Sequence, residues 1–230
     1  MLACVLTGGN KVEFSPEGKA FARIHGKTML EYVTEALAGV SAIQKIVVIK
    51  DHERLIDSVH EALQQGPEQD QYVLIVTCDV PFLTTEAVED FLARCQSDAD
   101  LYYPIVDKRD YERRFPGIRR TYVKLKEGTF TGGNLFLVKP GKLLPILGRV
   151  EKILELRKSP LALSAELGVS FVVRLLLTKL AGLLTISKLE TRIAEMFELD
   201  ARAVISPYPE VAHDIDRPDD LEWATKMLSG

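Results

Sequence analysis

The amino-acid sequence predicts an α/β fold, in which a mostly parallel sheet carries helices on both faces. The first half of the chain alternates short apolar runs with longer segments whose apolar residues recur at helical spacing. The apolar runs are nearly continuous and rich in β-branched residues, which is typical of strands buried on both faces. Strands that alternate with helices favour parallel pairing, because each connecting helix packs back onto the sheet.

The first part of the chain supplies three strands and three helices. In chain order we expect strand Leu2–Leu6, helix Thr28–Ala38, strand Ile46–Ile49, helix His52–Gln64, strand Tyr72–Thr77 and a helix from about Thr85 to Cys95. The first two helices place apolar residues three and four positions apart, so one face of each can pack on the sheet. The third helix follows Thr84, whose hydroxyl is suited to cap a helix N-terminus.

The second half of the chain has a different pattern. Strands are expected at Leu101–Val106, Leu135–Val138 and Ala203–Ile205, followed by a terminal helix with Pro218 in its first turn. Residues from about 142 to 200 are almost wholly helical in pattern. We therefore expect a single domain over residues 1–230 with a helical insertion at about 142–200.

This helical insertion is more apolar than one exposed helix face requires. Its apolar residues include Phe171, Val172, Leu175, Leu176, Leu180, Leu183 and Leu184. Packing within the insertion is the simplest explanation. A homodimer interface, a hydrophobic acceptor tail and a membrane surface are the alternatives.

Composition excludes some classes of function. The chain has 29 Lys and Arg against 33 Asp and Glu, a net charge of −4, which argues against a general nucleic-acid or polybasic membrane binder. Cys4, Cys78 and Cys95 lack metal-ligand spacing and are expected to be reduced thiols. Met1 is followed at once by a strand, and charged residues interrupt the most apolar stretch, so we expect a cytoplasmic protein without a transmembrane segment.

The most informative stretch is Cys78-Asp79-Val80-Pro81-Phe82-Leu83, which directly follows the Tyr72–Thr77 strand. Asp79 would lie at the carboxyl end of a central strand, where open α/β sheets place their ligands. A carboxylate there can hold Mg²⁺, which in turn grips the phosphates of a nucleotide. A helix cap or a turn carboxylate is the alternative interpretation of Asp79.

Two further segments follow expected strands. Gly8 and Gly9 come after the first strand and precede Lys19, and such glycines allow backbone N–H groups to approach phosphates. Asp214 and Asp216 are two positions apart, so they would share one side of an extended chain. A plain Gly-Gly turn, a solvated lysine and a helix cap at Asp216 are the alternatives. The dinucleotide fingerprint G-x-G-x-x-G is absent, which disfavours a nicotinamide or flavin enzyme.

Taken together, these motifs resemble those of a known family. In chain order they are Leu-Thr-Gly-Gly, Gly-Lys-Ala-Phe, Gly-Lys-Thr-Met-Leu-Glu-Tyr-Val, Cys-Asp-Val-Pro-Phe-Leu, Thr-Gly-Gly-Asn and Asp-Ile-Asp-Arg-Pro-Asp-Asp-Leu. The sequence is similar to the MobA-like nucleotidyltransferases, which include molybdenum-cofactor guanylyltransferase, methylerythritol-phosphate cytidylyltransferase and the sugar-nucleotide pyrophosphorylases. The resemblance covers residues 1–138 and 203–228. It implies the GT-A fold, a Rossmann-like three-layer α/β/α sandwich.

The resemblance also implies roles for individual residues. Nucleotide binding would fall to Leu6, Thr7, Gly8, Gly9, Lys19 and Cys78, and acceptor binding to Gly132, Gly133 and Asn134. Asp79 and Lys19 would be catalytic, and Asp216 with Asp214 would complete the metal site. The expected reaction is Mg²⁺-dependent transfer of NMP from an NTP to a small phosphorylated or hydroxylated acceptor, with release of pyrophosphate. A GT-A glycosyltransferase and a non-catalytic nucleotide-binding module are the alternatives.

Two departures from the family pattern leave the base specificity open. Asn10–Phe14 stands where the family loop carries an arginine, and few residues separate Ile49 from Tyr72. A basic run over residues 108–126 could receive a small anionic acceptor, or it could be a solvated loop with internal ion pairs. The histidines His25, His52, His60 and His213 show no ligand spacing and are expected on the surface.

Overall fold

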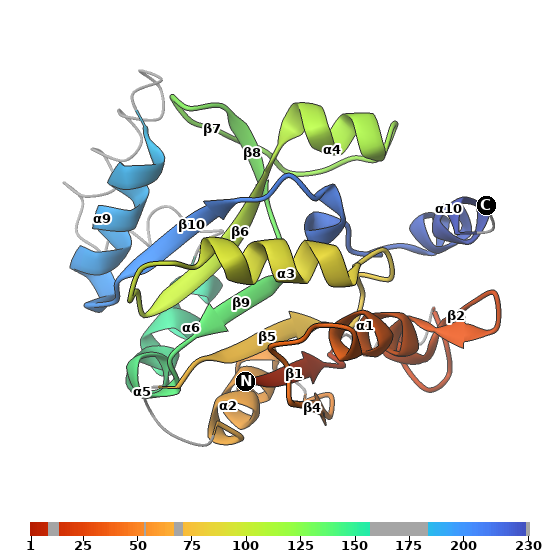
Figure 1. Ribbon diagram of the computed structural model, residues 1–230, viewed down its shortest axis with the longest axis horizontal. Coiled ribbons are helices and arrows are strands. Elements are labelled where there is room, and N and C mark those ends of the chain that lie inside the picture. Colours follow the sequence, from red (N-terminus) through yellow and green to blue (C-terminus); the bar gives the residue numbers. More distant parts are fainter. Residues whose placement is uncertain (9–13, 53, 67–70, 157–183, 229–230) are drawn as a thin grey trace.

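The computed structural model describes residues 1–8, 14–52, 54–66, 71–156 and 184–228, with side chains left out of the description at 154–156. Figure 1 shows a twisted central sheet with helices packed along it. The strands, in spatial order, are β4 (Lys45–Ile49), β1 (Leu2–Leu6), β5 (Val73–Thr77), β9 (Leu135–Val138), β6 (Leu101–Asp107), β8 (Thr129–Gly132) and β7 (Val123–Lys124). A further strand, β10 (Ala201–Ile205), also pairs with β6.

Parallel pairing joins β4, β1 and β5, as the alternation of elements predicts. Leu6 lies opposite both Ile49 and Thr77, so these three strands end at the same edge of the sheet. In contrast, β9 runs antiparallel to both of its neighbours, β5 and β6. The first residues of β9 therefore lie at the edge where β5 ends.

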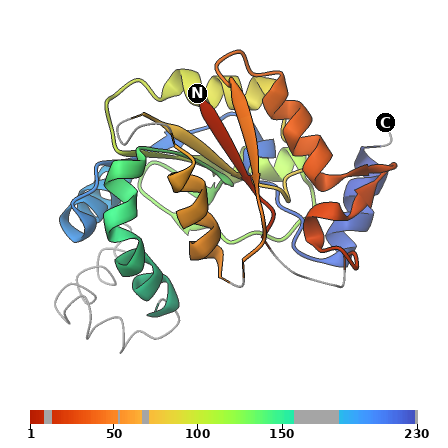
Figure 2. The ribbon, with the colours of Figure 1, turned by 90° about the horizontal axis from the view of Figure 1, so that it is seen from below.

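The sheet separates two helical layers. Figure 2 shows α1 (Met29–Ala38) and α3 (Thr85–Arg94) on one face, with α2 (Leu55–Gln64) and α6 (Leu147–Leu156) on the other. Separate apolar clusters fill the two faces, because alternate side chains of each strand point in opposite directions. This three-layer α/β/α arrangement is the expected Rossmann-like fold class. That one domain covers residues 1–230 stays a prediction.

Local signals explain where the helices begin. Thr28 accepts a hydrogen bond from the backbone of Glu31 at 3.1 Å, and the Glu31 carboxylate accepts one from the backbone of Thr28 at 2.6 Å. This reciprocal capping box fixes the start of α1. Thr84 caps α3 by accepting a hydrogen bond from the backbone of Ala87 at 3.2 Å, as its position predicts.

The remaining helices, strands and turns complete the description. They are the hairpin strands β2 (Arg23–Ile24) and β3 (Lys27–Thr28), the helices α4 (Lys108–Arg114), α5 (Pro140–Leu143), α9 (Ile186–Phe197) and α10 (Pro218–Met227), and the 3₁₀ turns η1 (Lys19–Phe21), η2 (Leu144–Ile146) and η3 (Pro209–Ala212). The helix expected from His52 begins at Leu55, and the loop considered for 108–126 contains α4 and β7.

The expected insertion at 142–200 is helical at both described ends, in α6 and α9. Its apolar residues from Phe171 to Leu183 lie outside the described residues. Among the helices that the structure describes, none has the length and apolar character that crossing a membrane requires.

Candidate functional site

Three distant segments meet at the carboxyl edge of the parallel strands. Cys78, just beyond β5, donates its backbone N–H to the carbonyl of Leu6 at 3.0 Å. One residue later, the carbonyl of Asp79 accepts a hydrogen bond from the backbone of Ile215 at 2.9 Å. These two bonds join the end of β1, the end of β5 and the C-terminal Asp-Ile-Asp segment. Side chains from all three can therefore converge.

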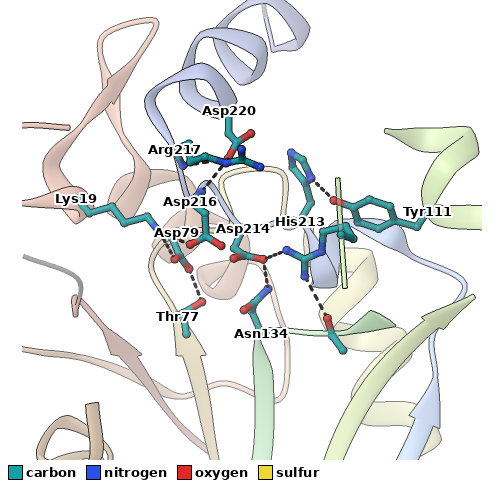
Figure 3. A network of polar contacts seen from close by, with 12 residues as sticks. Lys19, Thr77, Asp79, Tyr111, Asn134, His213, Asp214, Asp216, Arg217 and Asp220 are labelled. Atoms are coloured by element: carbon teal, nitrogen blue, oxygen red, sulfur yellow. Dashed lines mark hydrogen bonds and ion pairs between the residues drawn. The ribbon is translucent and has the colours of Figure 1, made fainter. Parts of the chain in front are cut away.

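The carboxylates of Asp79, Asp214 and Asp216 form one cluster. One oxygen from each residue lies within 4.8 Å of the others. Figure 3 shows the three side chains pointing toward a common space. The structure thus brings together the three residues that were expected to hold a metal.

Lys19 reaches this cluster from η1. Its ammonium lies 2.5 Å from Asp79 Oδ2 and 3.4 Å from Asp216 Oδ1, and its side chain is only 4% exposed. Burial by itself would lower the pKa of Lys19, but the neighbouring Asp79 carboxylate raises that pKa above its ordinary value. The lysine therefore remains a cation at neutral pH. Thr77 donates its hydroxyl to the other oxygen of Asp79 at 2.6 Å, so both Asp79 oxygens have fixed partners.

Asp214 is held by two donors from a different part of the chain. Arg120 Nη1 forms an ion pair with Asp214 Oδ1, and Asn134 Nδ2 donates to the same oxygen at 3.3 Å. Burial would raise the pKa of Asp214, but Arg120 outweighs it, so the pKa lies below its ordinary range. Burial and the adjacent Asp214 charge raise the pKa of Asp216, with Lys19 opposing them. The two carboxylates of the pair therefore differ in how readily they ionise.

The donor set of the cluster fits Mg²⁺. Magnesium prefers oxygen ligands, and it commonly binds through one or two carboxylates together with substrate phosphates. Like charges packed this closely repel one another, and a divalent cation relieves that repulsion. The cluster contains no soft sulfur or imidazole ligand among the described residues that would favour another metal.

The residues expected to bind the nucleotide differ in how they are placed in the structure. The side chains of Leu6 and Cys78 are buried, so these residues would contribute backbone groups to the site. Burial also raises the pKa of the Cys78 thiol. Thr7 donates its hydroxyl to the carbonyl of Ile49 at 2.8 Å, which ties the loop to β4. Gly8 approaches Asp51 so closely that a Cβ would lie 3.3 Å from its carboxylate. Gly9 lies outside the described residues.

The expected acceptor segment packs tightly beneath the cluster. A Cβ on Gly132 would lie 1.9 Å from the hydroxyl of Tyr103, and one on Gly133 would lie 2.8 Å from Pro104 Cγ. Both positions therefore require glycine. The backbone of Asn134 donates to the carbonyl of Val211 at 2.8 Å, which places its side chain beside Asp214. Of the three residues, Asn134 is the one that contacts a carboxylate of the cluster, that of Asp214.

His213 corrects the expectation that all four histidines lie on the surface. Its side chain is fully buried and stacks on the ring of Phe115, with ring centroids 4.0 Å apart. Its Nδ1 lies 2.7 Å from the Tyr111 hydroxyl, and its Nε2 has no hydrogen-bond partner among the described residues. Burial lowers the pKa of His213 to about 4, so the ring is neutral. The apolar neighbours Val211, Ala212 and Ile215 were the sequence signal for burial.

The other histidines, His25, His52 and His60, are exposed as expected. In the basic run, the four cations of α4 and its ends are paired with acidic side chains on the surface. The pairs are Lys108 with Glu112, Arg109 with Asp107, Arg113 with Asp110, and Arg114 with Glu210. Arg120 differs from them because its side chain is only 15% exposed. The sequence gives no local signal for that burial.

A hollow on the described surface borders this site, since Leu6 and Thr77 are among the residues that line it. It measures about 640 Å³ and lies between α2, α6 and the sheet, lined mainly by aliphatic residues such as Leu55, Ile56 and Leu147. Its charged lining residues, Arg54 and Glu151, pair with each other at 2.9 Å. The clustered carboxylates and Lys19 are not among the residues that line this hollow, so we assign the functional site to the carboxylate cluster.

Comparisons with known proteins identify the family of this chain. Residues 3–167 match the family model of the MobA-like NTP transferase domain. A curated relative, the probable molybdenum cofactor guanylyltransferase of Pyrococcus furiosus, is 32% identical over 108 residues, which cover 41% of this chain. The match spans 55% of that relative, or about half of its length.

Solved structures share the fold. A hypothetical transferase from Thermus thermophilus superposes with a TM-score of 0.83 at 36% identity, covering 96% of this chain and 98% of that one. CMP:2-keto-3-deoxy-manno-octonic acid synthetase complexed with CTP superposes with a TM-score of 0.59 at 14% identity, covering 99% and 98% of the two chains. The second likeness concerns the fold alone. Since the family model matches most of the chain, this protein belongs to the family of MobA-like NTP transferase domains.

Proposed function

We propose that this protein is a nucleotidyltransferase that moves the nucleoside monophosphate of an NTP to a small phosphorylated or hydroxylated acceptor in a Mg²⁺-dependent reaction that releases pyrophosphate. The observation that carries the proposal is the meeting of three carboxylates and a buried lysine at one edge of the sheet. Such a site suits phosphoryl-type transfer, because positioning and charge neutralisation lower its barrier more than acid–base chemistry does.

Asp79, Asp214 and Asp216 would hold the Mg²⁺. When bound, this cation would offset negative charge on the phosphates of the NTP. Asp79 has the most firmly fixed orientation of the three carboxylates, since Thr77 bonds one of its oxygens and Lys19 the other. Asp214 loses its proton more readily than Asp216, so it is the more readily charged ligand of the Asp-Ile-Asp segment.

Lys19 would bind the phosphate tail and stabilise the pyrophosphate that leaves. It is a buried cation, and a charge in such a water-poor place acts more strongly than an exposed one. The glycine loop after β1 would bring backbone N–H groups to the same phosphates. Gly132, Gly133 and Asn134 would border the acceptor, with the Asn134 amide beside the Asp214 carboxylate.

The identity of the donor is a finer question. One relative is called a probable molybdenum cofactor guanylyltransferase, so GTP with molybdenum cofactor is the first donor and acceptor pair to test. The test measures pyrophosphate release with ATP, CTP, GTP and UTP in turn, in the presence of Mg²⁺ and a panel of phosphorylated and hydroxylated acceptors. We expect one NTP to support acceptor-dependent release of pyrophosphate.

The same assay separates the alternatives. Transfer from a nucleotide sugar, with no reaction of any NTP, would indicate a GT-A glycosyltransferase. Tight NTP binding with no pyrophosphate from any acceptor in the panel would favour a non-catalytic module. Either result would contradict the proposal.

A further inference from the structure

Arg120 lies at the carboxylate cluster but has no role in the reaction described so far. It comes from the segment between α4 and β7, and its guanidinium lies 5.6 Å from the centre of the Tyr111 ring. Its side chain is only 15% exposed. Removing a guanidinium from water costs free energy unless ion pairs and hydrogen bonds compensate for the lost hydration. A structural ion pair alone could have been replaced by apolar packing, so this cost calls for an explanation.

The guanidinium of Arg120 has donors to spare. Arginine offers five N–H groups in a planar fork. Nη1 meets Asp214 Oδ1, and Nη2 makes a long contact of 3.4 Å with the carbonyl of Gly132. The Nε–H is buried and has no acceptor among the described residues. A buried donor without a partner is destabilising, which is the pattern expected where a ligand supplies the missing acceptor.

Arg120 also lies on the side of the cluster away from Lys19. Lys19 joins Asp79 and Asp216, whereas Arg120 joins Asp214 and the carbonyl of Gly132. Lys19 was assigned to the phosphate tail of the donor, and Gly132 to the border of the acceptor. The two buried cations thus face the two ends of the proposed reaction.

The four cations that the basic run contributes to α4 are less suited to bind an acceptor. Lys108, Arg109, Arg113 and Arg114 are paired with acidic side chains on or beside α4, at the surface. Exposed pairs of this kind are screened by water and salt. A planar guanidinium in a partly buried site binds phosphate or carboxylate through two parallel hydrogen bonds, and it does so more strongly.

We propose that Arg120 binds an acidic group of the acceptor, a phosphate or a carboxylate, while Asp214 holds the guanidinium in place. This proposal rests on the proposed function. It specifies that the acceptor carries an acidic group, which the planar guanidinium of Arg120 recognises. Asp214 would then connect the two substrates, because its carboxylate touches Arg120 and belongs to the metal cluster.

Binding of inorganic phosphate and of acetate tests the proposal without turnover. The protein is first saturated with Mg²⁺ and the α,β-methylene analogue of each NTP in turn, which fills the donor site. Phosphate or acetate is then titrated by calorimetry into wild type, Arg120→Met, Arg120→Lys and the control Arg119→Met, an exposed neighbour. The two anions distinguish phosphate from carboxylate recognition.

We expect Arg120→Met to weaken binding of the preferred anion by about 10- to 100-fold, the range expected for lost hydrogen bonds to a charged group. Arg120→Lys should give a smaller loss, since lysine keeps the charge but not the fork. Arg119→Met should bind like wild type, and affinity for the nucleotide analogue should change little in every variant.

Several results would overturn the proposal. They are equal anion binding by wild type and Arg120→Met, an equal loss in Arg119→Met, and an Arg120→Met variant that loses nucleotide and anion binding together with a lower melting temperature. If Arg120→Met does not fold, equal anion binding by wild type and Arg120→Lys decides against the fork. Failure of the proposed function itself looks different, because wild type would then bind none of the four nucleotide analogues, or would bind them but release no pyrophosphate from any NTP in the turnover assay.

Discussion

Individual side chains in the site are held in defined protonation states by their neighbours. Lys19 remains charged although it is buried, because Asp79 lies 2.5 Å away. Asp214 remains ionised because Arg120 outweighs its burial. Each charge in the cluster therefore depends on a specific partner, and loss of one partner should disturb function more than folding.

Replacement of Asp79 by asparagine should remove one charged metal ligand while keeping the size of the side chain. We expect the fold to persist and pyrophosphate release to fall by roughly 10²–10³-fold, as when one electrostatic group leaves a water-poor site. Steady-state assays and circular dichroism measure the two effects. Asp110→Asn on the exposed α4 is the matched control and should keep wild-type activity. Full activity in Asp79→Asn would refute the assignment.

His213 should make the stability of the protein depend on pH. Its folded pKa of about 4 lies below the ordinary histidine value of 6.5, so the unfolded chain takes up a proton first as the pH falls. The contribution of His213 is complete above pH 6.5 and is lost as the pH falls toward 4. Between about pH 7.5 and pH 5 this loss amounts to about 2 kcal/mol of unfolding free energy.

Urea denaturation at these two pH values measures the effect. In His213→Phe the ring cannot take up a proton, so the drop in unfolding free energy between them should be smaller than in wild type. His60→Phe, which changes an exposed histidine, is the control. Equal drops in wild type and His213→Phe would show that His213 is not the source.

Sequence reasoning found some of these residues and missed others for physical reasons. Asp79 could be predicted, because a polar residue that directly follows a buried strand is brought to the sheet edge. The Asp214–Asp216 pair could be predicted from its two-residue spacing, although the turn η3 separates it from β10. Arg120 could not, since its burial depends on the path of a segment between α4 and β7 that has no periodic pattern. His213 was misjudged because ligand spacing was considered without the apolar residues beside it.

At the scale of elements, the antiparallel strand β9 is what completes the site. Since β9 runs opposite to β5, its first residues lie beside the end of β5, and Asn134 next to β9 can reach Asp214. Backbone hydrogen bonds from Gly133 to Pro104 and from Asn134 to Val211, both at 2.8 Å, fix this corner. The packing of the corner between β8 and β9 thus sets the position of Asp214, one of the carboxylates proposed to hold the metal.

Gly133→Ala should disturb that corner. The added Cβ would lie 2.8 Å from Pro104 Cγ and 3.0 Å from the carbonyl of Val211. We expect a loss of about 1–3 kcal/mol of unfolding free energy from overpacking, together with reduced pyrophosphate release as the partner of Asp214 shifts. Gly148→Ala on α6 is the control, because its Cβ would meet nothing within 4 Å. Wild-type stability in Gly133→Ala would contradict this account.

Most strands and helices could be predicted within a few residues, because their apolar periodicity is clear. Strand Leu135–Val138 was predicted at its observed bounds, but its direction was not. Direction depends on which strands become neighbours, and a four-residue apolar run carries no information about that. The strands β2, β3 and β7 were missed because two-residue strands have no measurable period. The four-residue strand β8 was missed as well.

For the molecule as a whole, the three layers hold a rigid sheet edge on which the charged groups are mounted. The three carboxylates belong to neither apolar cluster of the sheet, so they are not needed to fill the core. A homodimer through the insertion stays a prediction. The proposed need for Mg²⁺ applies to the whole protein and can be tested on it directly.

Removal of divalent cations with EDTA should stop pyrophosphate release, and added Mg²⁺ should restore it. Because the sheet and helices are held by apolar packing, far-ultraviolet circular dichroism should not change. Mg²⁺ should raise the melting temperature, since a ligand that binds only the folded state stabilises it. Addition of Zn²⁺ or Ca²⁺ in place of Mg²⁺ serves as the control for metal identity. Undiminished activity in EDTA would exclude the metal-dependent mechanism.

The ion pair between Lys19 and Asp216 joins residues 197 positions apart, and the backbone of Ile215 bonds to that of Asp79. Ribosomes make the chain from its amino end, so a growing polypeptide displays Lys19 and Asp79 long before their last partners have been synthesised. An incomplete translation product that stops short of residue 214 can build much of the sheet yet has no finished cluster. The cluster can thus form only after residues 214–216 have been synthesised.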